Sequence, residues 1–408
     1  TCVAVMLAPL WDEGVVPSRA RDWKAQDLDM GHRLALMLRL GRVRHSLMKE
    51  LATITLVGVR ASVLLSCARE ILSPEGTITF SAPRPASTAD TFRYSKPEAR
   101  IDWFISHSWR DSMFLKRITL HLHFNLLTAA VLANVTAAVC ACFTYLGFLP
   151  AYTLDYGTGL INVIGWSGPV YTLALFAGLA WGHKFRLAQD PSLFVDKACI
   201  PQRDAKQKAE GIKGIRAVII RSRRMLILWG PDYFQRLWCN FELACYSATH
   251  SEKYVDFEPI ARGLHTVVVV LCFGISVSSF LVFFALRMEH LVGGDVFFTL
   301  LVLSFLPNGI VLGVFQSHSL HNRRQLFEEM AHFQASHAQC FCCSTGHRVP
   351  GTTEPVACDR EFVKSELDYF FDGGERGFDT YVRTSLRQRM SSMLGTPVLP
   401  ILMRDLVL

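Results

Sequence analysis

The chain has 408 residues, of which half are hydrophobic, 42 are Lys or Arg and 35 are Asp or Glu, giving a formal net charge of +7. This length suits two or three domains, and the hydrophobic share excludes an intrinsically disordered chain. The 12 cysteines lie mostly in apolar runs or basic segments, which excludes a disulfide-stapled secreted scaffold. No groove-reading motif accompanies the basic charge, so we expect no nucleic-acid partner.

Residues 1–100 are expected to form a basic, partly helical N-terminal region followed by a linker. Apolar residues alternate with arginines in a pattern that fits either a helix on an anionic membrane surface or, as we favour, a solvated helix packed on the next domain. The pattern consists of Arg33, Leu34, Leu38, Arg39, Arg42, Val43 and Arg44. Pro, Ser and Thr are frequent from residue 73 to 100, which is typical of a linker. Because the first residue is Thr1 rather than Met, we expect a fragment or a processed start.

Four long uncharged runs have the length and composition of membrane-spanning helices. They cover residues 124–149, 160–181, 264–286 and 296–315, the last interrupted near its centre by Pro307. At about 1.5 Å per residue, each is long enough for a hydrocarbon core of about 30 Å. Core helices of a large soluble protein are the alternative, but four uncharged runs favour spans. We therefore predict two transmembrane hairpins, at 124–181 and 264–315, in contact with membrane lipids.

The distribution of Lys and Arg sets the expected topology. Residues 182–263 hold more basic than acidic residues, whereas the short connections within the two hairpins hold almost no basic residue. Lys116, Arg117, Arg323 and Arg324 flank the spans on the same side. The positive-inside rule then places residues 182–263 and both termini in the cytoplasm. We accordingly predict a multi-pass membrane protein with an even number of spans.

Residues 182–263 have the pattern of strand, helix, strand, helix. Short apolar segments at 193–195 and 225–229 are typical of buried parallel strands. Between them, apolar residues recur at helical spacing. A second helical pattern follows and puts Trp238 and Glu242 close to one face. Glu242 is thereby expected near the carboxyl ends of the strands, where open α/β sheets bind ligands.

Two blocks of the chain resemble a TIR domain of the Toll/interleukin-1 receptor and plant-resistance type. The first block, Ile101-Asp102-Trp103-Phe104-Ile105-Ser106-His107-Ser108-Trp109-Arg110-Asp111, is similar to the opening strand of that family, with its Asp-x-Phe-(Ile/Leu)-Ser core. The second block matches, in family order and with near-family spacing, at Phe194, Asp196, Ser222, Tyr233, Trp238, Cys239, Glu242 and Leu243. The resemblance implies an α/β fold with a flavodoxin-like parallel sheet and flanking helices. Residues 101–123 would form its first half and residues 182–263 its second half, on either side of the first hairpin.

The resemblance implies two functions. The first, which we favour, is a membrane-anchored signalling protein that associates with further copies of itself or with other TIR-like domains. The second is an NAD⁺ glycohydrolase, in which Glu242 would be the catalytic carboxylate that stabilises the oxocarbenium-like charge as nicotinamide leaves. NAD⁺ would then be bound by Phe104, Ser106, Ser108, Trp109, Arg236 and Trp238. The structural alternatives are a surface or capping carboxylate for Glu242 and a core anchor for Trp238.

The chain departs from the family pattern at two loops that would border such a site. Residues 198–208 lack the Gly that often lets a TIR loop close over its ligand, and Gln235, Arg236 and Leu237 replace the usual small residues. Arg236 fits either a phosphate-binding or a pocket-blocking role. A channel or transporter is the weakest alternative, because the four runs contain no Asp, Glu, Lys or Arg.

Residues 316–408 are expected to form a cytoplasmic tail with helices and a cluster of Cys and His. Two helical patterns surround Gly373 and Gly374, and they fit either closing helices of the α/β domain or a separate helical hairpin. The cluster offers soft ligands at a spacing suited to Zn²⁺, although it matches no standard zinc-finger pattern. Free or acylated thiols are the alternative. The cluster consists of Cys340, Cys342, Cys343, His347 and Cys358.

Overall fold

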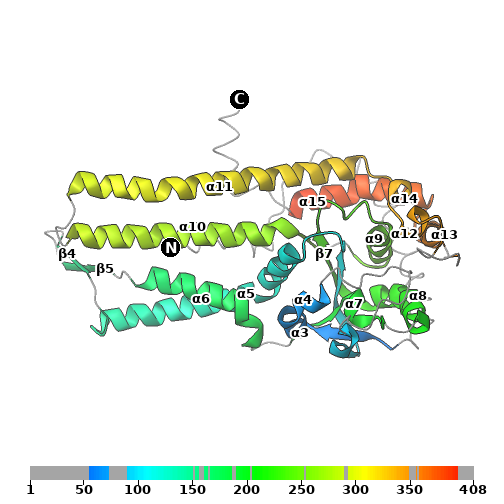
Figure 1. The fold of residues 1–408 in the computed structure, drawn as a ribbon, viewed down its shortest axis with the longest axis horizontal. Helices are drawn as coiled ribbons and strands as arrows, with labels where there is room; N and C mark the ends of the chain where they lie inside the picture. Colours follow the sequence, from blue (N-terminus) through cyan, green and yellow to red (C-terminus); the bar gives the residue numbers. More distant parts are fainter. Residues whose placement is uncertain are drawn as a thin grey trace, which may run out of the picture. The chain divides into compact units, whose positions relative to one another are not determined.

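The computed structural model describes residues 55–72, 90–149, 152–155, 160–163, 166–185, 190–202, 205–251, 254–288, 293–348, 355 and 358–393 (Figure 1). The chain divides into residues 1–50 and 51–408, and all described residues belong to the second unit. The expected basic helix at residues 33–44 and the first part of the expected linker, residues 73–89, lie outside the described residues. Residues 90–100 contain a 3-10 helix, η3 (Thr91–Tyr94), and a two-residue strand, β2 (Lys96–Pro97).

A six-stranded, mostly parallel sheet forms the centre of the α/β part. Its strand order is β2, β1 (Val57–Arg60), β6 (Ser192–Phe194), β3 (Ile101–His107), β7 (Ser222–Trp229) and β8 (Val255–Pro259). Strand β3 pairs in parallel with β6 and β7, and β7 with β8, whereas β1 is antiparallel to its two neighbours. Phe104 on β3 is the register partner of Phe194 on β6. The expectation that the segments on either side of residues 124–181 join one sheet is therefore confirmed.

The core lies between this sheet and helices on its faces. Met225 to Leu228 on β7 are completely buried, which is why this strand reads as a continuous apolar run. Helices α8 (Ala205–Arg221) and α9 (Leu237–Thr249) contact β3 and each other. Short helices α3 (Ala61–Ser66) and α7 (Asp196–Cys199) contact β1, and α4 (Ala68–Ile71) packs against α3. The amphipathic pattern of α8 thus faces the sheet, as its spacing predicts.

The C-terminal helices belong to the same α/β body. Helix α13 (Asp359–Phe370) packs against α9, and Arg216 on α8 forms an ion pair with Glu366 on α13 at 2.9 Å. A turn with positive φ at Gly373 and Gly374 separates α13 from α14 (Glu375–Tyr381). A π-helical turn (Val382–Leu386) and α15 (Arg387–Met393) follow. Of the two alternatives for this region, the contacts favour closing helices over a separate hairpin.

Three helices are long and apolar enough to cross a membrane. They are α5 (Met113–Tyr145), α10 (Ile260–Met288, apolar over Ile260–Phe284) and α11 (Gly294–Ala331), the last continuous through Pro307. Many of their large apolar side chains are exposed, among them Leu127, Phe298 and Val302. Such extended apolar surface is typical of helices that contact lipid.

The prediction of a fourth full-length span at residues 160–181 is wrong. Leu160–Val163 instead forms strand β5, which pairs with β4 (Tyr152–Asp155) in an antiparallel ribbon. Helix α6 begins only at Ser167 and has 15 residues, to Trp181. At about 1.5 Å per residue it covers only about 22 Å. Pro169 lies in the first turn of α6, where the backbone N–H that proline lacks would have no intrahelical partner.

Close contacts join the apolar helices to one another. Helix α5 packs against α6 and α10, and α10 packs against α11. A Cβ atom at Gly178 on α6 would lie 2.5 Å from the Cα atom of Ala129 on α5, so only glycine permits this approach. The buried Asn125 donates from Nδ2 to the Leu179 carbonyl oxygen at 2.8 Å. The Asn125 Nδ2 group therefore pairs with the backbone of the neighbouring helix, which offsets its removal from water.

Candidate functional site

A cavity of about 930 Å³ opens at the carboxyl ends of β3 and β6, where His107 and Asp196 line it. The chain runs from β3 to β6 on one side and then to β7 on the other side of β3, and open α/β sheets bind ligands at such a switch of direction. The wall of the cavity comes from the loop after β3, the start of α9, the inner face of α8 and a segment of the C-terminal region. Together with Asp196 at the start of α7, segments from five parts of the sequence therefore meet at this point.

Glu242 lines the cavity from α9 and is held from below by the central strand. Its Oε2 atom accepts a hydrogen bond from Ser106 Oγ at 2.5 Å, and Ser106 Oγ is also 2.8 Å from the hydroxyl of the buried Tyr233. Burial raises the pKa of Glu242 to about 8, although the hydrogen bond from Ser106 opposes this rise. The carboxyl group is therefore mostly protonated at neutral pH when the cavity holds no cation.

A second acidic group, Asp196, lies at the start of α7 on the same cavity. Its Oδ2 accepts a hydrogen bond from Trp109 Nε1 at 3.0 Å, and its Oδ1 accepts one from the Lys197 backbone N–H at 2.7 Å. Burial raises the pKa of Asp196, and these hydrogen bonds oppose the rise. Trp109 is thereby fixed in one orientation beside the cavity.

His107, the last residue of β3, presents a buried imidazole to the cavity. Its ring meets the Trp109 ring edge-on, with centroids 4.4 Å apart. Burial and the nearby Lys116 ammonium hold the pKa of His107 well below its usual range, so the ring is neutral. Its Nε2 atom has no hydrogen-bond partner among the described residues, although the side chain is only 7% exposed. A buried nitrogen of this kind is available to a bound ligand.

Asp111 lies against the backbone of the loop after β7. A Cβ atom at Gly230 would overlap the Asp111 carboxylate, so this loop needs glycine for the close approach. Burial raises the pKa of Asp111 to about 6, and the nearby Lys116 ammonium opposes the rise. Lys116 itself is buried and donates to the Ser108 carbonyl oxygen at 2.9 Å. These contacts fix the shape of the loop that follows β3.

The C-terminal segment closes one side of the cavity. The Gln339 N–H donates to the Gln235 carbonyl oxygen at 2.6 Å, and the Leu237 N–H donates to the Gln339 carbonyl oxygen at 3.2 Å. Arg110 Nη1 donates to Gln339 Oε1 at 2.6 Å. Trp238 Nε1 donates to Asp359 Oδ2 at 3.1 Å. Residues 337–340, 343–344 and 359–360 therefore form one wall of the cavity.

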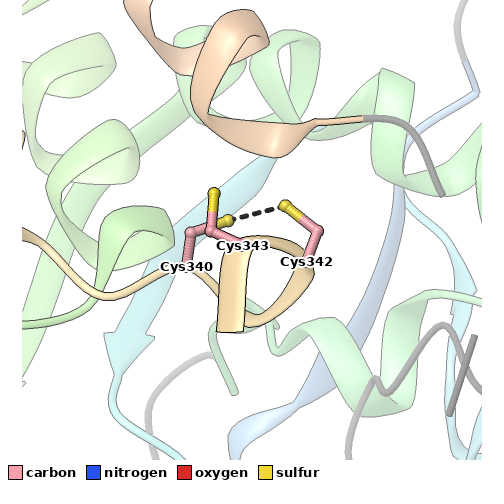
Figure 2. A group of neighbouring side chains, drawn as sticks. All are labelled: Cys340, Cys342 and Cys343. Carbon is pink, nitrogen blue, oxygen red and sulfur yellow. Dashed lines mark hydrogen bonds between the residues drawn. The ribbon is translucent and has the colours of Figure 1, made fainter. Parts of the chain in front are cut away.

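A cluster of Cys and His lies in that same segment. The ligand atoms of Cys340, Cys342 and Cys343 are within 4.8 Å of one another, and so are those of Cys342, His347 and Cys358. Figure 2 shows the first three, with the sulfur atoms of Cys340 and Cys342 facing each other at 2.9 Å. The structure thus brings together all five residues that the sequence nominated as metal ligands, and the cluster could hold a metal such as zinc.

The residues nominated for NAD⁺ differ in their positions. Trp109, Arg236, Trp238 and Glu242 line the cavity. Ser106 is completely buried beneath it and contacts Glu242. Phe104 and Ser108 are also completely or almost completely buried, and they are not among the lining residues.

Phe104 and Ser108 instead make contacts within the protein. The Phe104 ring stacks on Phe194 with centroids 5.2 Å apart. The Ser108 hydroxyl accepts a hydrogen bond from the Arg110 N–H at 3.3 Å. Both residues therefore shape the sheet and its loop, and in this arrangement neither reaches a ligand in the cavity.

Several residues that line the cavity were not predicted from the sequence. His107 and Asp111 lie at the end of the first TIR-like block, and this position at the carboxyl end of β3 could have predicted that they line the cavity. Gln339 and Asp359 come from a region with no family motif. Only their packing on α9 assigns them to the site.

No family model, no curated protein and no solved structure matches this chain. The function is therefore inferred from the residues of the chain and their geometry.

Proposed function

We propose that this chain is a membrane-anchored α/β protein whose cavity binds NAD⁺ and cleaves the bond between its ribose and nicotinamide. The observation that carries the proposal is the Glu242 carboxyl group, which faces a cavity of about 930 Å³ at the carboxyl ends of the parallel strands. The order β6, β3, β7, β8 also supports a TIR-like domain, because it corresponds to the second, first, third and fourth strands of a flavodoxin-like sheet.

The charge of the substrate suits the state of Glu242. The nicotinamide ring of NAD⁺ is cationic, and a cation close to a buried carboxyl group favours its ionised form. Binding would therefore lower the raised pKa of Glu242 and release a proton. The carboxylate would then accept hydrogen bonds from the ribose hydroxyls and stabilise the positive charge that develops at the ribose carbon. Water adds to that carbon as neutral nicotinamide leaves, and the products are ADP-ribose, nicotinamide and a proton.

The remaining cavity residues supply groups that a dinucleotide requires. Arg236 offers a guanidinium for a phosphate. Trp109 and Trp238 offer ring surfaces, and their indole N–H groups are already held by Asp196 and Asp359, so the rings are fixed before a ligand binds. His107 adds a neutral nitrogen. Ser106 acts through Glu242 and is a positioning residue in this mechanism.

The membrane part of the proposal rests on α5, α10 and α11, which are long and apolar enough to span a bilayer. Because the sheet contains strands from before α5 and after α6, the chain must return to the side from which it left. The excess of Lys and Arg in residues 182–263 supports a cytoplasmic position for the sheet and for both termini.

A second candidate is a signalling protein that associates with copies of itself or with other TIR-like domains and does no chemistry. One observation favours this candidate. The Glu242 carboxyl group is hydrogen-bonded to Ser106, which in turn contacts Tyr233, and a residue with a purely structural role would make the same contacts. In that case the cavity residues stabilise the fold, and function resides on the surface of the domain.

An NAD⁺ consumption assay on the full chain in detergent distinguishes the two candidates. We expect turnover by the wild type and a loss of about 100-fold or more in Glu242→Gln, because one positioned group at a developing charge commonly contributes that much. Glu361→Gln on the exposed surface of α13 is the matched control and should retain full turnover. Equal turnover in wild type and Glu242→Gln would remove the enzymatic proposal. Cross-linked oligomers without any turnover would favour the second candidate.

A further inference from the structure

Three thiols form the shared centre of the Cys and His cluster. Cys342 belongs to both groups of neighbouring ligand atoms, Cys343 Sγ lies 4.0 Å from Cys358 Sγ, and every other pair among the three is within 4.8 Å. A tetrahedral Zn²⁺ with Zn–S bonds of about 2.3 Å holds its sulfur ligands about 3.8 Å apart. The three sulfur atoms therefore already lie near the separations that one ion requires.

Cys340 and His347 are the two candidates for the fourth ligand. Cys340 Sγ lies within 4.8 Å of the sulfur atoms of Cys342 and Cys343, and a ring nitrogen of His347 lies equally close to those of Cys342 and Cys358. His347 is the one non-glycine residue with positive φ in the part of the chain that the structure describes, at +58°. Such a conformation is uncommon for non-glycine residues, although histidine adopts it more often than most. Here the turn brings the His347 N–H to the Cys342 carbonyl oxygen at 2.8 Å.

We propose that Cys342, Cys343 and Cys358, with Cys340 or His347 as the fourth ligand, bind one structural Zn²⁺. Soft thiolates together with imidazole are the ligands that Zn²⁺ prefers, and three Cys plus one Cys or His fill its coordination shell without an open position. The ion bridges the turn at residues 340–347 and Cys358, the residue before α13.

This link fixes one wall of the cavity. Cys340 and Cys343 are themselves lining residues. The Asp359 N–H donates to Cys342 Sγ at 3.3 Å, while the Asp359 carboxylate accepts from Trp238. Arg360 donates to the carbonyl oxygens of Ser336 and Ala338. The metal therefore holds the start of α13 and the segment over the strand ends in one arrangement, without any contact to Glu242.

The test measures metal content in the full chain purified in detergent, after loading with Zn²⁺ and removal of unbound ion. We expect one Zn²⁺ per chain in the wild type, and loss of most of it in Cys342→Ser and in Cys358→Ser. Cys67→Ser, a partly exposed thiol outside the cluster, should retain the full amount. The absorption spectrum of the Co²⁺-loaded chain then identifies the fourth ligand, because four-sulfur and three-sulfur one-nitrogen sites differ in their visible bands.

A second measurement guards against variants that fail to fold. A chelator should lower the unfolding temperature of the wild type and of Cys67→Ser, and should not change that of Cys358→Ser, which has no metal to lose. The proposal is overturned if the Zn²⁺-loaded wild type retains no metal, or if Cys342→Ser and Cys358→Ser bind as much as the wild type. Both results are independent of NAD⁺ turnover.

Discussion

The hydroxyl oxygen of Ser106 lies 2.5 Å from Oε2 of Glu242, so the central strand of the sheet holds a carboxyl group that α9 presents to the cavity. The same hydroxyl contacts Tyr233, which is completely buried. Burial works to keep Glu242 protonated, and Ser106 works in the opposite direction. The balance leaves a carboxyl group with a pKa of about 8, which a nearby cation would ionise.

The raised pKa of Glu242 makes a pH-dependent contribution to stability. Its pKa is 4.5 in the unfolded chain and about 8 in the folded protein, so the folded state binds the extra proton between these values. Stability from this group is complete below pH 4.5 and is lost as the pH rises to 8, at about 1.4 kcal/mol for each unit of difference. Glu242→Gln should abolish this loss. Unfolding temperatures of both proteins from pH 5 to pH 9 should therefore diverge, with the variant the more stable at the alkaline end.

Asp111 titrates in the same interval, with a pKa of about 6, and it serves as the internal control because it is present in both proteins. The difference between the two curves isolates Glu242. Parallel curves for wild type and Glu242→Gln would show that the Glu242 carboxyl ionises normally in the folded protein.

Gly230→Ala should destabilise the α/β part by about 1–3 kcal/mol, as overpacking of a filled space commonly does. The added Cβ would overlap the Asp111 carboxylate. Gly214→Ala on α8 is the matched control, since nothing lies within 4 Å of its added Cβ. That change should be neutral or stabilising, because alanine favours a helix more than glycine does. Thermal unfolding measures both.

The pair Asp111→Ala and Gly230→Ala tests the origin of this cost. If the clash is with the Asp111 side chain, the double variant should be more stable than the sum of the single effects allows. Strict additivity would instead mean that the glycine is needed for its backbone alone.

Strands β6 and β7 could be predicted from the sequence because their signals are local. The continuous apolar run at residues 225–229 falls in β7, and residues 193–195 overlap β6. Strand β1 was not predicted, because its place beside β6 depends on antiparallel pairing between Val59 and Leu193, far apart in sequence. A short segment interrupted by Arg60 carries no periodicity that reveals such a partner.

The residues of the candidate site were likewise only partly predictable from the sequence. The family-like motif predicted Glu242 and Trp238 at the strand ends. It also nominated Phe104, because a motif records which residue is present and not which way it points. On β3, Phe104 faces the interior and stacks on Phe194. Gln339 reaches the cavity through backbone pairing with the loop before α9, which no sequence pattern encodes.

The ion pair between Arg216 and Glu366 should hold α13 on α8. Arg216 Nη1 lies 2.9 Å and 3.1 Å from the two carboxylate oxygens, and the guanidinium also lies over the Tyr369 ring. Both side chains are mostly buried, so Glu366→Ala leaves a cation without its partner and should cost about 1–3 kcal/mol.

The exposed pair of Arg93 and Glu70 is the control for this prediction. It has a similar distance, 3.1 Å, but its side chains are 57% and 44% exposed. Glu70→Ala should therefore cost much less than Glu366→Ala, because solvent screens an exposed ion pair. Equal losses for the two variants in denaturant unfolding would mean that α13 does not depend on the buried pair.

The ribbon of β4 and β5 should lie on the opposite side of the membrane from the sheet. Strands β3 and β6 are neighbours in one sheet, so the chain that leaves along α5 must return along α6. Helix α6 alone, with 15 residues, is too short for a hydrocarbon core of about 30 Å. A glycosylation acceptor with flexible flanks, inserted between Asp155 and Leu160, should be modified in microsomes. The same insertion at Glu98, next to the sheet, should remain unmodified, and modification of both or of Glu98 alone would contradict this topology.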